Sequence, residues 1–228
     1  MSGVRRVCVV EASLTQTDER RPVLRGWSHL IAAVAAIVVC PLVIVFSPGL
    51  RTAVAIYAAA VIGLFLVSGT YHTVLWGTRA EGFARRLDHA MIFVLIAATY
   101  TPIAVSSLPR NAATLILVVV WTGAVMGLAT QLTRRSLPRR LIVSLYIVVG
   151  WAITPVVHLL WGVLGVTGFG LLLIGGVLHT VGAVIYATER PNPYPRWFGF
   201  HEIFHLLVIG AVAAHYVVIA FVISPSSA

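Results

Sequence analysis

A small set of residues that can bind metals or move protons lies near the ends of otherwise apolar stretches. Ser68 and His72 stand four positions apart, and His201 and His205 have the same spacing. Residues four apart lie on one side of an α-helix, so each pair predicts a polar patch on one helix. Asp88 adds a carboxylate at the start of a third apolar stretch. Ionisable side chains are costly inside a membrane, which marks all of these residues as functional candidates.

This combination fits a divalent metal, and zinc best. Three neutral imidazoles, from His72, His201 and His205, would leave a fourth position for water, which is the pattern of catalytic zinc. Asp88 would hydrogen-bond that water, and Ser68 would lie beside it or orient His72. Bound zinc brings the pKa of its water close to neutrality and so makes hydroxide available. The predicted chemistry is hydrolysis close to a membrane surface.

The segment from His201 to His205 also reads His-Glu-x-x-His, the motif of zinc proteases. In that interpretation Glu202 is the general base. The alternative is an acid that is favoured near the positive end of a helix dipole.

The other histidines differ in position. His29, near the start of the first apolar stretch, would either support the metal site from behind or pack between helices. His89 follows Asp88 and must point elsewhere on its helix, which favours a packing role. Three more are expected to be structural residues that face the interior of a helical bundle: His158, His179 and His215.

The composition indicates that most of this chain lies in lipid. Of its 228 residues, 59% are hydrophobic and only 10% are charged, whereas a soluble domain is about a quarter charged. The 16 basic residues are all arginine, and the net charge is +9. They stand at the edges of apolar stretches, as in membrane proteins, whereas a nucleic-acid-binding surface would group them on one polar face. Nucleic acid is therefore not an expected partner.

Seven apolar stretches predict an all-α fold, a bundle of seven transmembrane helices. A spanning helix needs about 20 apolar residues, and in lipid it satisfies its own backbone hydrogen bonds. Residues 1–24 form a predicted N-terminal tail, residues 25–223 the membrane domain, and residues 224–228 a short outer tail. The predicted helices cover about 27–46, 52–76, 88–107, 112–132, 138–161, 166–187 and 200–223.

The arginines also predict the orientation. Two of them, Arg51 and Arg110, lie on one side of the predicted membrane, and the other 14 of the 16 lie on the opposite side. Because positively charged segments stay in the cytoplasm, we expect a cytoplasmic N-terminus and a C-terminus outside. The arginine-only, alanine-rich composition suggests the plasma (inner) membrane of a bacterium. The candidate site would then lie near the cytoplasmic face.

At these residues the chain resembles the hemolysin III branch of the progestin and adipoQ receptor family, which includes the adiponectin receptors. The resemblance covers about residues 22–223. It implies seven helices with the N-terminus inside, and a zinc ion held by His72, His201 and His205 with Ser68 and Asp88 near its water. The matching segments are RGWSH (25–29), SGTYH (68–72), LDHA (87–90), TYTP (99–102) and HEIFH (201–205).

The resemblance also places the chain in a wider superfamily of membrane hydrolases that includes alkaline ceramidases. The leading hypothesis is zinc-dependent hydrolysis of an amide or ester in a membrane lipid, which would enter from the bilayer. The second is a receptor or regulator of lipid homeostasis with zinc as a structural clamp, and the third is a cytolysin. The first two differ at Asp88, because only hydrolysis needs its carboxylate. Glu202 is not general in the superfamily, which weakens the protease interpretation, and the oligomeric state is left open.

Overall fold

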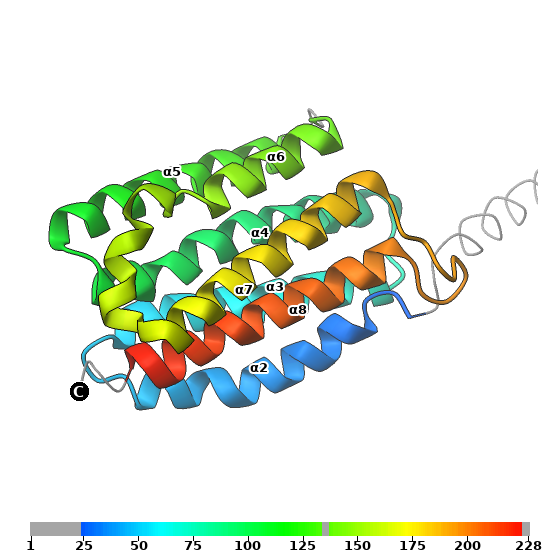
Figure 1. Cartoon of the computed structure of the whole chain (residues 1–228). Helices are drawn as coiled ribbons and strands as arrows, with labels where there is room; N and C mark the ends of the chain where they lie inside the picture. Colours follow the sequence, from blue (N-terminus) through cyan, green and yellow to red (C-terminus); the bar gives the residue numbers. More distant parts are fainter. Residues whose placement is uncertain (1–23, 134–136, 225–228) are drawn as a thin grey trace, which may run out of the picture.

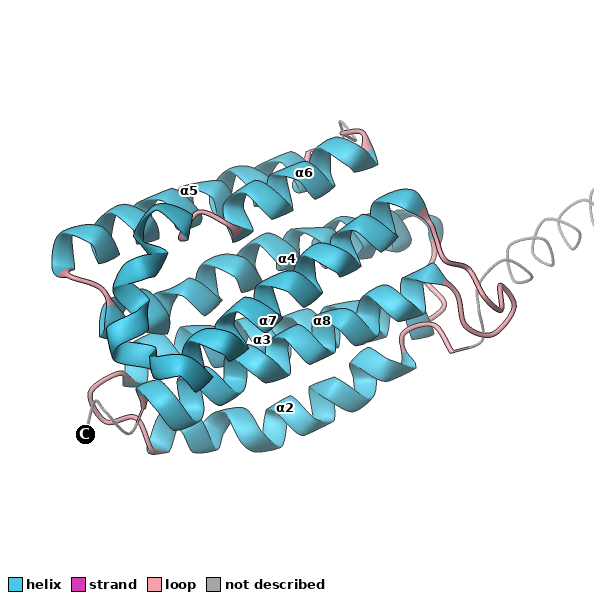
Figure 2. Ribbon diagram, in the orientation of Figure 1, coloured by secondary structure: helices cyan, strands magenta, loops and turns pink. Residues whose placement is uncertain are grey.

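The computed structural model describes residues 24–133 and 137–224, and in these residues all regular structure is helical apart from one isolated bridge (Figure 2). The all-α prediction is therefore confirmed. The elements are α2 (Trp27–Val45), α3 (Arg51–Thr73), α4 (Thr78–Ser107), α5 (Arg110–Leu132), α6 (Arg139–Gly150), the 3-10 helix η1 (Thr154–Leu160), α7 (Trp161–Thr188), α8 (Phe200–Val217) and the π-helix η2 (Val218–Ile223).

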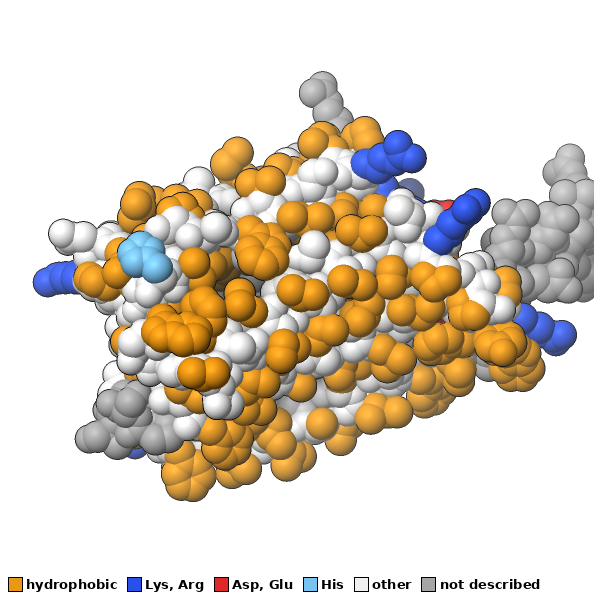
Figure 3. Space-filling view, in the orientation of Figure 1, with side chains coloured by type: hydrophobic (Ala, Val, Ile, Leu, Met, Phe, Trp, Pro, Cys, Tyr) orange, Lys and Arg blue, Asp and Glu red, His pale blue; other side chains and the backbone are white. Residues whose placement is uncertain are grey.

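The protein is a multi-pass membrane protein. In the described part of the chain, 6 helical stretches are long and apolar enough to cross a bilayer. Their outward faces carry exposed Val, Ile, Leu and Phe side chains, and Figure 3 shows these hydrophobic side chains covering the flank of the bundle. Exposure of so continuous an apolar surface to water would be unfavourable, whereas lipid tails are equally apolar and can solvate it.

The sequence predicted seven separate helices, and the difference lies in one stretch. Residues Arg139–Thr188 form one apolar run of 50 residues. A turn at 151–153 separates α6 from η1, α7 follows η1 directly, and Gly165 within α7 has a non-helical backbone with φ 61°. The α-helix stops at Gly150, shortly before Pro155, which lacks the N–H that a helix interior requires. Figure 1 shows the chain changing direction between α6 and α7.

Helix α4 begins at Thr78, ten residues before the predicted start at residue 88. Its first turns contain Arg79, Glu81, Arg85 and Arg86, so hydropathy alone cannot detect them. Helix α3, by contrast, ends at Thr73 rather than at residue 76. Because α4 starts early, Asp88 lies inside a continuous helix rather than at its first residue.

The helices pack mainly against their neighbours in sequence, and α2 closes the bundle by packing against α8 (Figure 1). The Tyr216 hydroxyl of α8 donates a hydrogen bond to the Val39 carbonyl of α2, at 3.1 Å. Gly127 of α5 allows a close approach to α4, because a Cβ there would lie 2.4 Å from the Phe93 ring. This agrees with the close helix packing expected of small residues in membranes.

The two ends of the bundle differ in the number of arginines that they carry. Arg51 and Arg110 stand at the first residues of α3 and α5. The other described arginines lie at the opposite ends of the helices, which we call the arginine-rich end: Arg25, Arg79, Arg85, Arg86, Arg139, Arg140, Arg190 and Arg196.

Candidate metal centre

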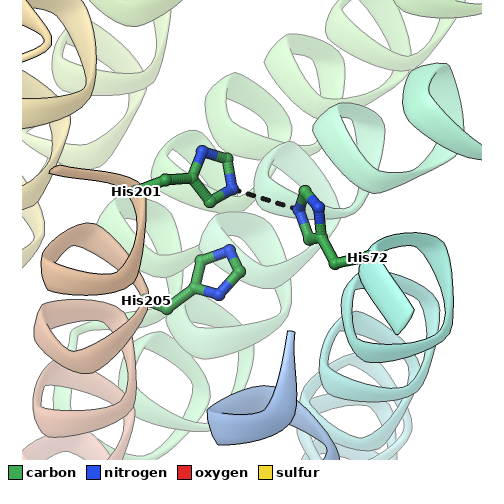
Figure 4. Close-up of side chains that lie close together, drawn as sticks. All are labelled: His72, His201 and His205. Atoms are coloured by element: carbon green, nitrogen blue, oxygen red, sulfur yellow. Dashed lines mark hydrogen bonds between the residues drawn. The ribbon is translucent and has the colours of Figure 1, made fainter. Parts of the chain in front are cut away.

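Three histidines converge at the arginine-rich end of the bundle. His72 lies in the last turn of α3, whereas His201 and His205 lie in the first turns of α8. Figure 4 shows the three imidazoles pointing toward one another. One ring nitrogen from each lies within 4.8 Å of the other two, and the Nε2 atoms of His72 and His201 are 3.1 Å apart. We call these three residues the histidine triad.

The triad fits a metal ion. Two nitrogens at about 2.0–2.1 Å from one tetrahedral zinc are about 3.3 Å apart, close to the separation of His72 and His201. The Nδ1 atom of His205 is buried and has no hydrogen-bond partner, although buried polar atoms normally have one. Only 5% of the His72 side chain is exposed, and His205 is 1% exposed. Imidazoles are ligands that suit zinc and several other transition metals, so the structure supports a metal site without selecting its ion.

The two other predicted site residues lie beside the triad. Asp88 of α4 places Oδ2 3.8 Å from Nε2 of His72, and its side chain is only 14% exposed. The side chain of Ser68, one turn before His72 on α3, is buried and interacts with the Asp88 carboxylate. The structure thus brings together all five residues that the sequence singled out, from α3, α4 and α8.

The contacts of Glu202 indicate a structural role rather than a role in proton transfer. Its Oε2 accepts a hydrogen bond from the Gly199 N–H at 2.7 Å, which caps the start of α8. Its Oε1 lies 3.4 Å from Nε of Arg25, and the carboxylate side chain is only 4% exposed. Both oxygens are therefore committed to the helix start and to an ion pair, which favours the capping interpretation over a general base.

The first helix supports the triad from behind. The ring of His29 stacks on that of His205, with centroids 3.8 Å apart. Just before α2, Gly26 has φ +86°, and a Cβ at this position would lie only 2.6 Å from the Cβ of His72. Glycine is needed here because other residues avoid this φ, and the space it leaves is filled by the His72 side chain.

His89 is fully occupied by hydrogen bonds, as a packing residue would be. Its Nδ1 lies 2.7 Å from the Arg85 carbonyl, and its Nε2 lies 2.7 Å from the Tyr186 hydroxyl. In a neutral ring Nδ1 donates to the carbonyl, so Nε2 accepts from the hydroxyl. No ring nitrogen of His89 is left to bind a metal.

A second histidine pair lies deeper in the bundle. His179 of α7 and His215 of α8 have ring centroids 5.6 Å apart. Nε2 of His215 is 3.3 Å from the Leu172 carbonyl, so this nitrogen has a donor role. Both residues face the interior, as predicted, whereas the same expectation is wrong for His158, which is exposed in η1.

An apolar cavity of about 110 Å³ connects these two regions. It begins at Asp88 and His201 and continues to His179 and His215, between α4, α6, α7 and α8. A second cavity of about 140 Å³ shares Tyr100, Trp151 and His215 with the first and extends it toward the other end of the bundle. The lining is mainly aliphatic and aromatic, which suits a hydrocarbon chain.

Sequence reasoning gave support of the site by His29 as one of two alternatives, but it missed two specific contacts of this site. The stacking of His29 on His205 joins the first and last helices, and no spacing rule relates residues so far apart. The pairing of Arg25 with Glu202 is of the same kind. The only signal in the sequence was the presence of polar residues at the start of both apolar stretches.

Comparisons with known proteins agree with the motifs. A family model described as "Haemolysin-III related" matches residues 17–216. "Hemolysin-3" of Bacillus cereus is 31% identical over 207 residues, 88% of this chain and 90% of that protein. "Hemolysin-3 homolog" of Bacillus subtilis (strain 168) is 30% identical over 168 residues, 73% of this chain and 75% of that protein. "Heptahelical transmembrane protein 5" of Arabidopsis thaliana is 29% identical over 207 residues, 82% of this chain and 54% of that protein. The chain therefore belongs to the haemolysin-III-related family.

Proposed function

We propose that this protein is a zinc-dependent hydrolase that cleaves an amide or ester bond of a membrane lipid. One observation carries the proposal: a buried histidine triad with a carboxylate beside it stands at the mouth of an apolar cavity inside a membrane protein. A hydrocarbon chain bound in such a cavity would hold the acyl bond at its end next to the triad.

His72, His201 and His205 would hold the metal, and Asp88 and Ser68 would act on the reactants. A bound zinc ion supplies Lewis acidity and lowers the pKa of water near the acyl carbon. Asp88 would accept a proton as the water oxygen bonds to that carbon, and it would return the proton to the departing nitrogen or oxygen. Ser68 would orient the Asp88 carboxylate through the side-chain interaction between them. The products are a fatty acid and an amine or alcohol, so each turnover consumes one water molecule.

We also propose that the chain crosses the membrane seven times, with the N-terminus in the cytoplasm. The change of chain direction between α6 and α7 supports two crossings within Arg139–Thr188 (Figure 1). The unequal distribution of arginines between the two ends of the bundle supports the orientation. The bacterial relatives support a location in a bacterial plasma membrane.

The test is metal-dependent hydrolysis by the purified protein in liposomes. Release of fatty acid from lipid amides and esters would be measured before and after chelation and after zinc is returned. We expect activity to be lost and regained. In Asp88→Asn, activity should fall by about 10²–10⁴-fold while bound metal is retained. Equal rates in Asp88→Asn and the wild type would refute the assignment of Asp88.

A receptor or regulator with a structural metal is the second candidate. The observation that favours it is the position of the triad, since a metal there would join α3 to α8. In this case the Asp88→Asn variant would keep its metal and its stability, and no acyl bond would be cleaved.

A leakage assay on the same liposomes tests the haemolytic activity that the names of the Bacillus relatives denote.

A further inference from the structure

A polar cavity of about 630 Å³ lies at the arginine-rich end of the bundle. We call it the arginine vestibule, because its lining includes four arginines together with His72 and His201: Arg25, Arg85, Arg86 and Arg139. No carboxylate occurs among the described residues that line it. So many guanidinium groups around one cavity make it a site of strong positive potential.

Two of the four arginines have partners that neutralise them. Arg25 pairs with Glu202, and Arg139 pairs with Glu189. Arg139 also lies over the ring of Tyr186, 5.1 Å from its centroid. These two side chains are therefore held in place by the protein itself.

The other two arginines have no carboxylate partner; Arg85 is exposed, and Arg86 is half-buried. In the part of the chain that the structure describes, neither Arg85 nor Arg86 has a carboxylate within 4.0 Å. The Nε atom of Arg86 is moreover buried without a hydrogen-bond partner. A buried cationic donor without a partner costs free energy, and a phosphate or carboxylate group would offset that cost through charge-assisted hydrogen bonds.

Orientation of the protein in the membrane does not by itself explain this cluster. Arginines at one end of the bundle are expected from the positive-inside rule, but that rule does not require them to surround a cavity. Arg79, Arg140, Arg190 and Arg196 stand at the same end and do not line the vestibule. Convergence on a cavity next to the triad is thus a separate feature of Arg25, Arg85, Arg86 and Arg139.

The vestibule and the apolar cavity meet at His201 of the triad. His89, Tyr186 and His201 line both of them. An amphiphile can therefore place its charged group among the arginines and its hydrocarbon chain in the apolar cavity, with the bond between them beside His201. A neutral lipid would leave the buried Nε of Arg86 without a partner.

We propose that the lipid substrate is anionic, with a phosphate or carboxylate headgroup bound by Arg85 and Arg86. This inference rests on the proposed hydrolase and specifies its substrate class. Hydrolysis of such a lipid adds the water oxygen to the acyl carbon and breaks the carbon–nitrogen or carbon–oxygen bond. The departing group takes the proton and keeps the anionic headgroup.

A matched pair of substrates tests the charge. N-oleoylglycine and N-oleoylethanolamine have the same acyl chain and the same amide bond, but only the first carries a carboxylate. We expect kcat/KM to favour N-oleoylglycine by about 10- to 100-fold, the range for a hydrogen bond to a charged group. In the double variant Arg85→Gln, Arg86→Gln this preference should fall to about threefold or less.

Two further variants control for charge and folding. The double variant Arg85→Lys, Arg86→Lys keeps the positive charges and should retain most of the preference. Arg110→Gln removes an arginine at the opposite end and should leave the preference as in the wild type. Equal hydrolysis of both amides by the wild type would overturn the inference and leave the hydrolase intact.

Binding without turnover provides the second readout. Dodecyl phosphate, dodecanol and inorganic phosphate would be compared by thermal unfolding of the protein in a neutral detergent. We expect only dodecyl phosphate to raise Tm, and the glutamine double variant to lose this effect. An equal rise in Tm with inorganic phosphate would overturn the proposal of an amphiphilic ligand and indicate a site for the free anion. Stabilisation by dodecyl phosphate, without hydrolysis of either amide or of any lipid amide or ester in the liposome assay, would refute the hydrolase and support an anionic-lipid binding site.

Discussion

The histidine triad and the deeper pair of His179 and His215 place the same side chain in two different surroundings. At the arginine-rich end, three ring nitrogens face one point, with the Asp88 carboxylate close by. In the deeper pair only two rings approach each other, and one nitrogen of His215 already lies against the Leu172 carbonyl. Burial alone therefore does not distinguish the two clusters. What distinguishes the triad is the convergence of three nitrogens near a carboxylate, the arrangement that a metal site requires.

The largest expected effect separates the two clusters by metal content. Alanine in place of His72, His201 or His205 should reduce bound metal from about one ion per chain to near zero, since a lost ligand weakens binding by more than about 100-fold. Alanine in place of His179 or His215 should leave the metal content unchanged. Elemental analysis of the proteins purified in detergent without chelator measures both. Metal loss in the His179 and His215 variants would show that the deeper pair belongs to the site.

The second prediction uses two glycines that each leave room for a histidine. In Gly26→Ala, the new Cβ would lie 2.6 Å from the Cβ of His72, and the positive φ would also be strained. In Gly175→Ala, the new Cβ would lie 2.2 Å from Nε2 of His215. We expect the first variant to lower metal affinity by about tenfold and the second to leave it unchanged.

Competition with a chromophoric chelator measures this difference in affinity. Gly162→Ala is a suitable control, because no atom lies within 4 Å of a Cβ at that position. Equal affinities in Gly26→Ala and Gly175→Ala would mean that the approach of Gly26 to His72 does not position the ligand.

The third prediction concerns the support of His205 by His29. Loss of the stacked ring in His29→Ala should weaken metal binding by about two- to tenfold, since an aromatic pair contributes about 0.5–1.5 kcal/mol. His29→Phe retains an aromatic ring and should bind metal as tightly as the wild type. Titration of the apoprotein with zinc distinguishes them. If phenylalanine weakens binding as much as alanine does, His29 acts through its nitrogens rather than by stacking.

The smallest effect on activity is expected at Glu202, despite its place in the His-Glu-x-x-His segment. Glu202→Gln should change the rate of hydrolysis by less than about threefold, whereas loss of a general base costs about 10²–10⁴-fold. Its effect should appear in Tm, because Arg25 loses its buried partner. Glu189→Gln, in the exposed pair with Arg139, should change Tm less. A loss of activity as large as that in Asp88→Asn would restore the protease-like role of Glu202.

The convergence of the triad could be predicted because it needs only local rules and a topology. The spacing of His201 and His205 defines one helix face, and the alternation of apolar stretches brings His72 to the same end. The start of α4 at Thr78 could not be predicted in this way, since its first turns are charged. The interruption after Gly150 was also missed, although Pro155 gave a signal for it.

Contacts between helices distant in sequence escaped prediction for a different reason. The stacking of His29 on His205 and the ion pair of Arg25 with Glu202 depend on how α2 is rotated against α8. Apolar residues surround most of α2, so its sequence has little periodicity to fix this rotation. Only side-chain packing determines which of its few polar residues faces the bundle.

The pairing of α2 with α8 also has a consequence for how the protein is made. Polypeptides are synthesised from the N-terminus, so His29 and His72 enter the membrane well before His201 and His205 exist. The triad and its supporting ring are complete only when the last helix lies against the first. A chain that is truncated or stalled before α8 lacks two of the three histidines and therefore has no triad that could bind a metal. Metal occupancy would therefore report that biosynthesis has reached its end.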